Sequence, residues 1–179
     1  MPDFSEVPLL VAFTSFNCYA AQVDRLEDAE VARVMNSYYE LAESAIDAAG
    51  GRVVKFIGDA TLAVFPQKEV DRGILGLLDL KGTADQFMVE HGWECHLVIR
   101  AHFGPVAAGH FGAGAGRRYD VLGKTVNIAA RLESPGVALT VEAFRQLGPE
   151  TRRHFKKHTP PIMYIRQEDS HRPRWAKRT

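Results

Sequence analysis

The chain has 179 residues, of which 46% are hydrophobic and 25% charged, an ordinary balance for a globular protein. That length fits one domain better than two, and it can bury a hydrophobic core without disulfides or metals. Its 22 basic and 22 acidic residues give a net charge near zero, which argues against a general nucleic-acid-binding protein.

Neither a targeting signal nor a membrane span is evident. The first ten residues, MPDFSEVPLL, lack the basic region and long apolar run of a signal peptide. No apolar run approaches the about 20 residues of a membrane span. The cysteines, Cys18 and Cys95, lie far apart, which predicts free thiols in a reducing compartment. We therefore expect a cytoplasmic protein.

The first half of the chain alternates strand and helix patterns. Residues 7–16 are apolar and rich in β-formers, which predicts a buried strand. Residues 26–49 carry an apolar stripe of helical period and end at Gly50-Gly51, a favoured helix stop. Residues 52–65 predict two strands joined by a tight turn at Gly58-Asp59.

A second helix and a strand pair follow. Residues 73–90 predict an amphipathic helix weakened by Gly76 and Gly82. Residues 94–103 predict a strand, and Gly104-Pro105 predicts a turn into a return strand at 106–110. The glycine-rich segment 112–116 lacks the lysine and helix of a phosphate-binding P-loop, so we expect a flexible hairpin connection.

The last third predicts a helix, a strand, a helix and a strand, at 125–132, 138–141, 142–146 and 162–165. The whole order, β-α-β-β-α-β with C-terminal additions, predicts an α/β fold. Its ferredoxin-like core would be a largely antiparallel sheet flanked by helices. We expect one domain at 7–166, an N-terminal linker at 1–6, and a basic, solvated tail at 167–179.

Three segments carry the chemistry, at 51–65, 99–109 and 118–133. The last reads RYDVLGKTVNIAARLE, and the first reads GRVVKFIGDATLAVF. Together, in this order and spacing, they resemble the catalytic domain of class III adenylate and guanylate cyclases. The resemblance covers about residues 7–164.

The resemblance implies a role for each matching residue. Asp59 would bind a divalent metal, Mg²⁺ or Mn²⁺, together with the backbone carbonyl of Phe16. Lys55 and Asp120 would bind the purine, and Arg100 the triphosphate. In the same way, Asn127 and Arg131 would act at the reacting ribose and phosphate.

The chemistry of Lys55 and Asp120 suits adenine. Adenine offers an acceptor at N1 and a donor at its amino group, whereas lysine only donates and ionised aspartate only accepts. Guanine reverses both groups and would leave buried polar groups unpaired. The pair therefore predicts ATP as the substrate rather than GTP.

Taken singly, most of these residues have a plainer interpretation, except Arg100, which needs a partner inside an apolar strand. Asp59 and Asp120 suit turns, and Lys55 suits a solvated strand face. Arg131 suits a helix surface paired with Glu133. Only the joint pattern favours a catalytic site.

One metal ligand of the family is absent. Relatives carry an aspartate at the end of the first strand, where this chain reads Phe13-Thr14-Ser15-Phe16-Asn17-Cys18-Tyr19. An ungapped match places Ser15 at the aspartate, and a shift by one residue places Thr14 there. Neither is a carboxylate, and Cys18 replaces a family glycine.

The resemblance further implies a head-to-tail homodimer with active sites between the chains and no nucleic acid as a partner. The expected reaction converts ATP to 3′,5′-cyclic AMP and pyrophosphate, impaired by the loss of one metal ligand. A first alternative is a catalytically silent nucleotide-binding or dimerisation module of the same fold. A second is an interaction domain that binds no nucleotide.

Overall fold

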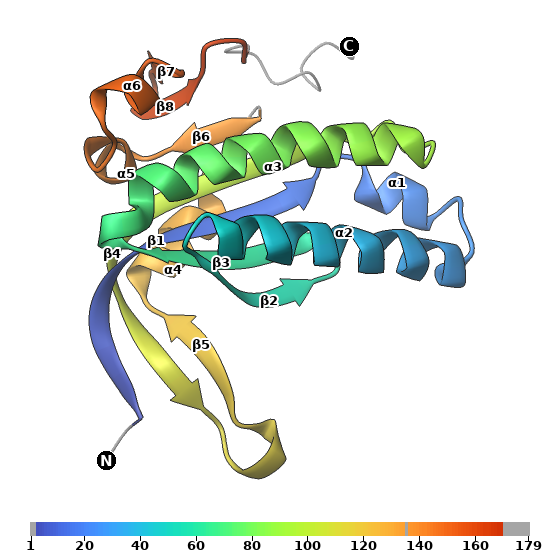
Figure 1. Cartoon of the computed structure of the whole chain (residues 1–179), viewed down its shortest axis with the longest axis horizontal. Coiled ribbons are helices and arrows are strands. Elements are labelled where there is room, and N and C mark those ends of the chain that lie inside the picture. The colour runs from blue at the N-terminus through green and yellow to red at the C-terminus, as the bar shows by residue number, and fades with distance from the viewer. Residues whose placement is uncertain (1–2, 135, 170–179) are drawn as a thin grey trace.

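The computed structural model describes residues 3–134 and 136–169, which form one eight-stranded sheet with helices packed on it (Figure 1). The sheet order is β2-β3-β1-β4-β6-β8-β7, and β5 pairs with β4. The strands are β1 (Phe4–Phe16), β2 (Arg52–Ile57), β3 (Ala60–Pro66), β4 (Leu97–Phe111), β5 (Arg118–Leu122), β6 (Val137–Leu139), β7 (Phe155–His158) and β8 (Met163–Arg166). The helices are α1 (Tyr19–Val23), α2 (Asp28–Ala48), α3 (Val70–Glu90), α4 (Lys124–Arg131), α5 (Val141–Arg145) and α6 (Pro149–Arg152), with 3-10 turns η1 (Gln67–Glu69) and η2 (Gly114–Gly116).

The predicted ferredoxin-like core is confirmed. Its elements follow the order β1-α2-β2-β3-α3-β4, and the long helices α2 and α3 lie on one face of the sheet (Figure 1). Strands β4 and β6 pair in parallel, and the other described pairs are antiparallel. No helix in the described residues is long and apolar enough to cross a membrane.

Alternation along β1 divides its side chains between the two faces of the sheet, because neighbouring strand residues point in opposite directions. Leu10, Ala12 and Phe16 join the large core beneath α2 and α3. Leu9 and Val11 join a smaller cluster on the opposite face, which α4 and β5 cover in part. The opposite face is therefore the more open one.

The helical layer depends on a glycine. A Cβ atom added to Gly76 of α3 would lie 2.4 Å from the Cβ of Ala49, just after α2. Gly76 therefore permits the close approach of the two helices, which offsets its weak helix propensity. Gly82 has no atom within 4 Å of such a Cβ, so nothing in the packing requires it.

The predicted turn at Gly104-Pro105 is wrong, because β4 runs without a break from Leu97 to Phe111. Pro105 lies opposite Pro8 of β1, and neither residue can donate to the ladder, so this is a pair that needs no hydrogen bonds. A Cβ at Gly104 would lie 2.7 Å from Oγ1 of Thr125. Here glycine permits the close approach of α4 rather than a turn.

The predicted linker at 1–6 is also wrong in part. Residues 4–6 belong to β1 and pair with residues 107–109 of β4, because β4 extends far enough to offer them partners. Residues 1–2 and the basic segment 170–179 lie outside the described residues. Within the expected tail, the Asp169 carboxylate accepts a hydrogen bond from the backbone N–H of Val137 at 3.0 Å.

The prediction of free thiols is wrong, since Cys18 and Cys95 form a disulfide. Their Cα atoms lie 5.3 Å apart, although 77 residues separate them in sequence. Cys18 follows β1 and Cys95 precedes β4, so the pairing of these two strands brings the sulfurs together. The bond therefore links the end of β1 to the start of β4.

Reducing this disulfide should lower the melting temperature. Release of a loop this long frees about 4 kcal/mol of chain entropy in the unfolded state. That corresponds to a fall of roughly 10 °C for a chain of this size. Calorimetry with and without dithiothreitol measures the shift. The Cys18→Ser variant should melt at the temperature of the reduced protein, with or without dithiothreitol. If reduction left the melting temperature of the parent unchanged, the disulfide would be contradicted.

Candidate active site

The open face of the sheet holds Ser15 and Arg100 on neighbouring strands. In the β1–β4 register Arg100 lies opposite Phe13, and Ser15 lies opposite Val98. The guanidinium Nη2 of Arg100 donates to Oγ of Ser15 at 2.5 Å. Ser15 is thus the side chain at the end of β1 that faces Arg100.

Thr14 points to the opposite face. It is fully buried, and its hydroxyl shares a 3.2 Å hydrogen bond with the hydroxyl of Tyr38 in α2. Of the two positions that the sequence offered for the absent aspartate, the geometry favours Ser15, because only Ser15 shares a face with Arg100.

Asp59 lies at the tip of the β2–β3 hairpin, after Gly58. The φ of Gly58 is 58°, a left-handed value that glycine adopts at no steric cost. The Oδ2 of Asp59 accepts a 2.7 Å hydrogen bond from the backbone N–H of Phe16. This contact holds the carboxylate beside the end of β1, one residue from Ser15.

Burial and charge act against each other at this site. Burial raises the pKa of Asp59 above its ordinary value, while hydrogen bonds from backbone N–H groups and the charge of Arg100 oppose the rise. Burial lowers the pKa of Arg100, and the charge of Asp59 opposes that change. The Nε of Arg100 is buried and has no acceptor in the described part of the chain. Each group therefore favours a ligand of opposite charge.

The oxygen atoms here suit one hard divalent cation. A carboxylate has about four acceptor sites, so the bond to Phe16 leaves Asp59 able to bind a metal. Ser15 offers a hydroxyl, and Phe16 a carbonyl. No group of three or more His, Cys, Asp or Glu side chains that could hold a metal exists in residues 3–134 and 136–169. The donor set does not fit a pair of cations bridged by two carboxylates.

Lys55 and Asp120 meet across β2 and β5. The Nζ of Lys55 lies 2.6 Å from Oδ2 of Asp120, with side-chain exposures of 35% and 14%. The other oxygen of Asp120, Oδ1, accepts from the backbone N–H of Val121 at 2.8 Å. The structure therefore brings together the two residues that the sequence predicted as a purine-binding pair.

A β-bulge in β2 adds a contact that sequence reasoning missed. Arg52 pairs with Val64 and Lys55 with Leu62, with an irregularity between Val53 and Lys55. Because of the extra residue, Arg52 and Lys55 point to the same face although they are three residues apart. The guanidinium of Arg52 lies 3.8 Å from the ring centroid of Tyr119, next to Asp120. No sequence signal marks the bulge.

Asn127 and Arg131 lie one turn apart on the exposed side of α4, as their spacing predicted. Helix α4 buries Thr125 and Ala129 against the sheet, and Thr125 donates to the Pro105 carbonyl at 2.6 Å. Neither Asn127 nor Arg131 has a side-chain partner among the described residues. Both are therefore available to a ligand or a second chain.

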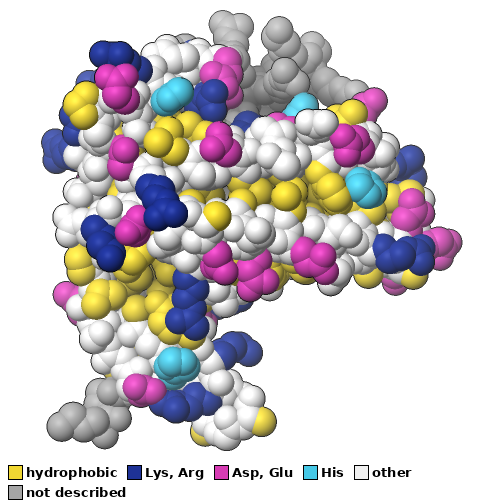
Figure 2. Space-filling view, viewed as in Figure 1, with side chains coloured by type: hydrophobic (Ala, Val, Ile, Leu, Met, Phe, Trp, Pro, Cys, Tyr) yellow, Lys and Arg dark blue, Asp and Glu magenta, His cyan; other side chains and the backbone are white. Residues whose placement is uncertain are grey.

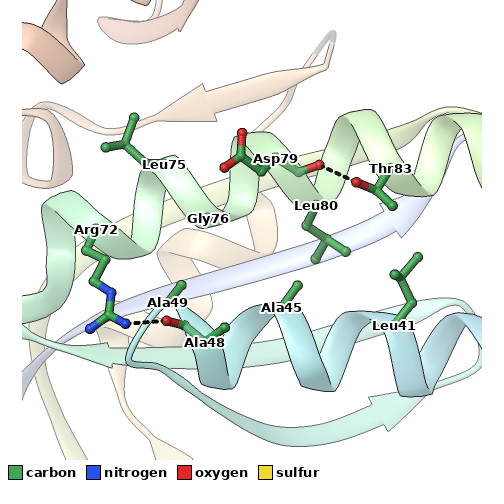
Figure 3. Close-up of a pocket in the computed structure, with 10 residues that line it drawn as sticks. All are labelled: Leu41, Ala45, Ala48, Ala49, Arg72, Leu75, Gly76, Asp79, Leu80 and Thr83. Carbon is green, nitrogen blue, oxygen red and sulfur yellow. Dashed lines mark hydrogen bonds between the residues drawn. The ribbon is translucent and has the colours of Figure 1, made fainter.

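A separate pocket of about 380 Å³ lies in the helical layer, between α2 and α3 (Figure 3). Apolar side chains line much of the furrow between these helices (Figure 2). None of the predicted site residues lines this pocket. It is on the opposite side of the sheet from Ser15 and Arg100, so the candidate active site is on the open face.

Comparison with known proteins agrees with this geometry. A family model described as "Adenylate and Guanylate cyclase catalytic domain" matches residues 3–158. The chain therefore belongs to the class III adenylate and guanylate cyclase catalytic domain family. Members of this family generally use divalent metal ions.

An adenylate cyclase of Anabaena cylindrica is 28% identical over 133 residues, which cover 70% of this chain and 26% of that protein. A bacterial light-regulated adenylyl cyclase superposes with a TM-score of 0.81 at 25% identity, covering 95% of this chain and 55% of that one. The adenylyl cyclase CyaB from P. aeruginosa shares the fold, with a TM-score of 0.80 at 17% identity, covering 96% and 99%. The chain spans about a quarter of the length of the Anabaena relative.

Replacing Asp59 with Asn should stabilise the metal-free protein at neutral pH. The pKa of Asp59 is higher in the folded protein than in the unfolded one. The protonated carboxyl therefore stabilises the folded state at pH values below the unfolded pKa, and this stabilisation is lost as the pH rises through the folded pKa. Asparagine stays neutral and can still accept from Phe16. We expect a melting temperature higher by a few degrees at pH 7.5, at about 2–4 °C per kcal/mol.

The gain should shrink as pH falls towards the pKa of the carboxyl. Added Mn²⁺ should stabilise the parent and not the variant, because only the parent keeps the anionic ligand. An equal gain at pH 4.5 and 7.5 would show that ionisation of Asp59 is not the cause.

Proposed function

We propose that this domain converts ATP to 3′,5′-cyclic AMP and pyrophosphate. The observation that carries the proposal is the 2.6 Å contact between Lys55 and Asp120, a donor and an acceptor held side by side on the open face. Their separation lets one adenine edge meet both groups, with N1 accepting from lysine and the amino group donating to aspartate. Guanine would present a donor to Lys55 and an acceptor to Asp120.

The reaction forms one phosphorus–oxygen bond and breaks another. The ribose 3′-oxygen attacks the α-phosphorus and loses its proton to solvent water, while the bond from the α-phosphorus to the bridging oxygen breaks and pyrophosphate leaves. Arg131 stabilises the charge that grows on the phosphate, and Asn127 orients the ribose. Arg100 binds the triphosphate. Asp59 and the Phe16 carbonyl would hold a Mg²⁺ or Mn²⁺ ion, which would neutralise charge and lower the pKa of the 3′-hydroxyl.

We propose further that two copies of the chain pair head to tail, with each site built from both. Asn127 and Arg131 are exposed and without side-chain partners in the described chain, so they suit a ligand held by another subunit. Leu122 and Ile128 beside them are large hydrophobic residues with exposures of 49% and 45%. Burial of such residues between chains favours association.

A second candidate function is a nucleotide-binding or dimerisation module without turnover. The single carboxylate at the metal site favours it, because one acidic ligand binds a divalent ion more weakly than two.

The proposed cyclase activity also bears on the location of the protein in the cell. The disulfide removes the cysteine-based argument for a reducing compartment, so the proposed cytoplasmic location rests on ATP as the substrate.

A cyclase assay with purified protein tests the proposed substrate. With Mg²⁺ or Mn²⁺ we expect cyclic AMP from ATP at least about tenfold faster than cyclic GMP from GTP, since unpaired polar groups cost about 1–3 kcal/mol each. The double variant Lys55→Glu with Asp120→Cys should shift this ratio towards GTP. Equal affinity of the parent for ATP and GTP, or ATP binding without product, would contradict the proposal, the latter in favour of the silent module.

Complementation tests the shared site. Asp59→Ala and Arg131→Ala should each abolish activity, because each removes a group needed at every site. A mixture of the two variants should recover activity, since a heterodimer assembles one intact site from the unmutated halves. Tagged co-purification verifies the heterodimer. An inactive heterodimer, from an active parent, argues against sites formed between chains.

A further inference from the structure

The position of Arg100 sets the number of cations that the site can hold. A pair of divalent ions about 4 Å apart needs anionic oxygens to bridge them. In this chain Asp59 is the carboxylate at the site, and the place of the second is filled by Ser15. A hydroxyl carries no charge, so it does not offset a second divalent cation.

Ser15 is also already engaged. Its Oγ accepts the 2.5 Å hydrogen bond from Nη2 of Arg100, and Nη1 of the same guanidinium lies 3.4 Å from the carbonyl of Ala130 at the end of α4. Two neighbouring elements therefore fix the guanidinium over the end of β1. A second metal at Ser15 would have to bind beside a guanidinium cation, on an oxygen that already accepts a hydrogen bond from it.

The guanidinium can do part of what a metal ion does for phosphate. It is planar, permanently charged and able to donate two parallel hydrogen bonds to phosphate oxygens. Arg100 interacts electrostatically with Asp59, so its charge offsets part of the charge of the carboxylate. Its buried Nε has no acceptor among the described residues, which leaves donor capacity for an incoming anion.

The geometry points to a one-metal site: the Arg100 guanidinium, held by Ser15, stands in for one of two divalent ions, and a single cation binds at Asp59 with each nucleoside triphosphate. This inference rests on the proposed function for the identity of the nucleotide. In this one-metal site Arg100 does more than contact the triphosphate. Its positive charge also makes a second metal ion unnecessary.

Counting bound Mn²⁺ tests the inference without measuring turnover. Free Mn²⁺ is followed by its electron paramagnetic resonance signal while protein is saturated with an ATP analogue whose α,β-bridging oxygen is a methylene. We expect one tightly bound Mn²⁺ per bound nucleotide in the parent. Ser15→Asp should bind a second Mn²⁺, with spectral broadening from two neighbouring ions.

Asn17→Asp is the matched control. It adds the same charge two residues further along the chain, and the new carboxylate can keep the 2.9 Å hydrogen bond that Asn17 accepts from the backbone N–H of His96. It should bind one Mn²⁺, like the parent. Melting temperatures establish that all variants are folded.

Arg100→Ala separates a metal substitute from a simple phosphate contact. Without nucleotide, loss of the nearby positive charge should tighten Mn²⁺ binding at Asp59 by about threefold or more. With nucleotide, the affinity for the analogue should fall by about tenfold, since a charge-assisted pair is lost. Arg100→Lys, which keeps the charge, should show no gain in Mn²⁺ affinity.

Two Mn²⁺ ions per nucleotide in the parent, or one in both the parent and Ser15→Asp, would overturn the inference. If no protein bound the analogue, the proposed function would fail instead. The nucleotide-free titrations would then still decide the inference: unchanged Mn²⁺ affinity in Arg100→Ala overturns it, and tighter binding supports it.

Discussion

The antiparallel pairing of β1 with β4 determines where the polar groups of the site lie. It runs from Phe4 to Phe16 without a shift in register. A slip of one residue would move every β1 side chain to the other face, placing Ser15 in the core and Thr14 beside Arg100. The 3.2 Å bond between Thr14 and Tyr38 and the Cys18–Cys95 disulfide both favour the observed register.

The site places opposite charges where burial disfavours each of them. Asp59 and Arg100 both have pKa values moved by burial towards their neutral forms, and each opposes the shift of the other. Burying such a charged group costs free energy in the protein without ligand, and a ligand of opposite charge stabilises the group. A cation at Asp59 and a phosphate at Arg100 meet that requirement together.

The proposed base-binding side of the site depends on contacts between β2 and β5 rather than on the core. Strand β5 pairs with β4 and reaches β2 through side chains, namely Lys55 with Asp120 and Arg52 with Tyr119. The β2 bulge turns both basic residues towards β5. The geometry of the proposed purine-binding pair is therefore coupled to the cation–π contact beside it, which holds the same two strands together.

Periodicity alone determined the two long helices, the β2–β3 hairpin and the order of the ferredoxin-like core, because each of those segments buries a continuous apolar stripe or face. The sequence also named Lys55 and Asp120, which the structure joins. The turn predicted at Gly104-Pro105 was wrong. Glycine and proline favour turns, and only the tertiary structure shows that Pro105 pairs with Pro8 and that Gly104 packs against Thr125. The expected hairpin connection at residues 112–116 implied a strand after it but did not locate β5, and no local pattern marked the β2 bulge or the disulfide. The disulfide and the contact of Arg100 with Ser15 join residues far apart in sequence. The pairing of β5 and the bulge in β2 depend on the neighbouring strand, so local sequence pattern does not reveal them.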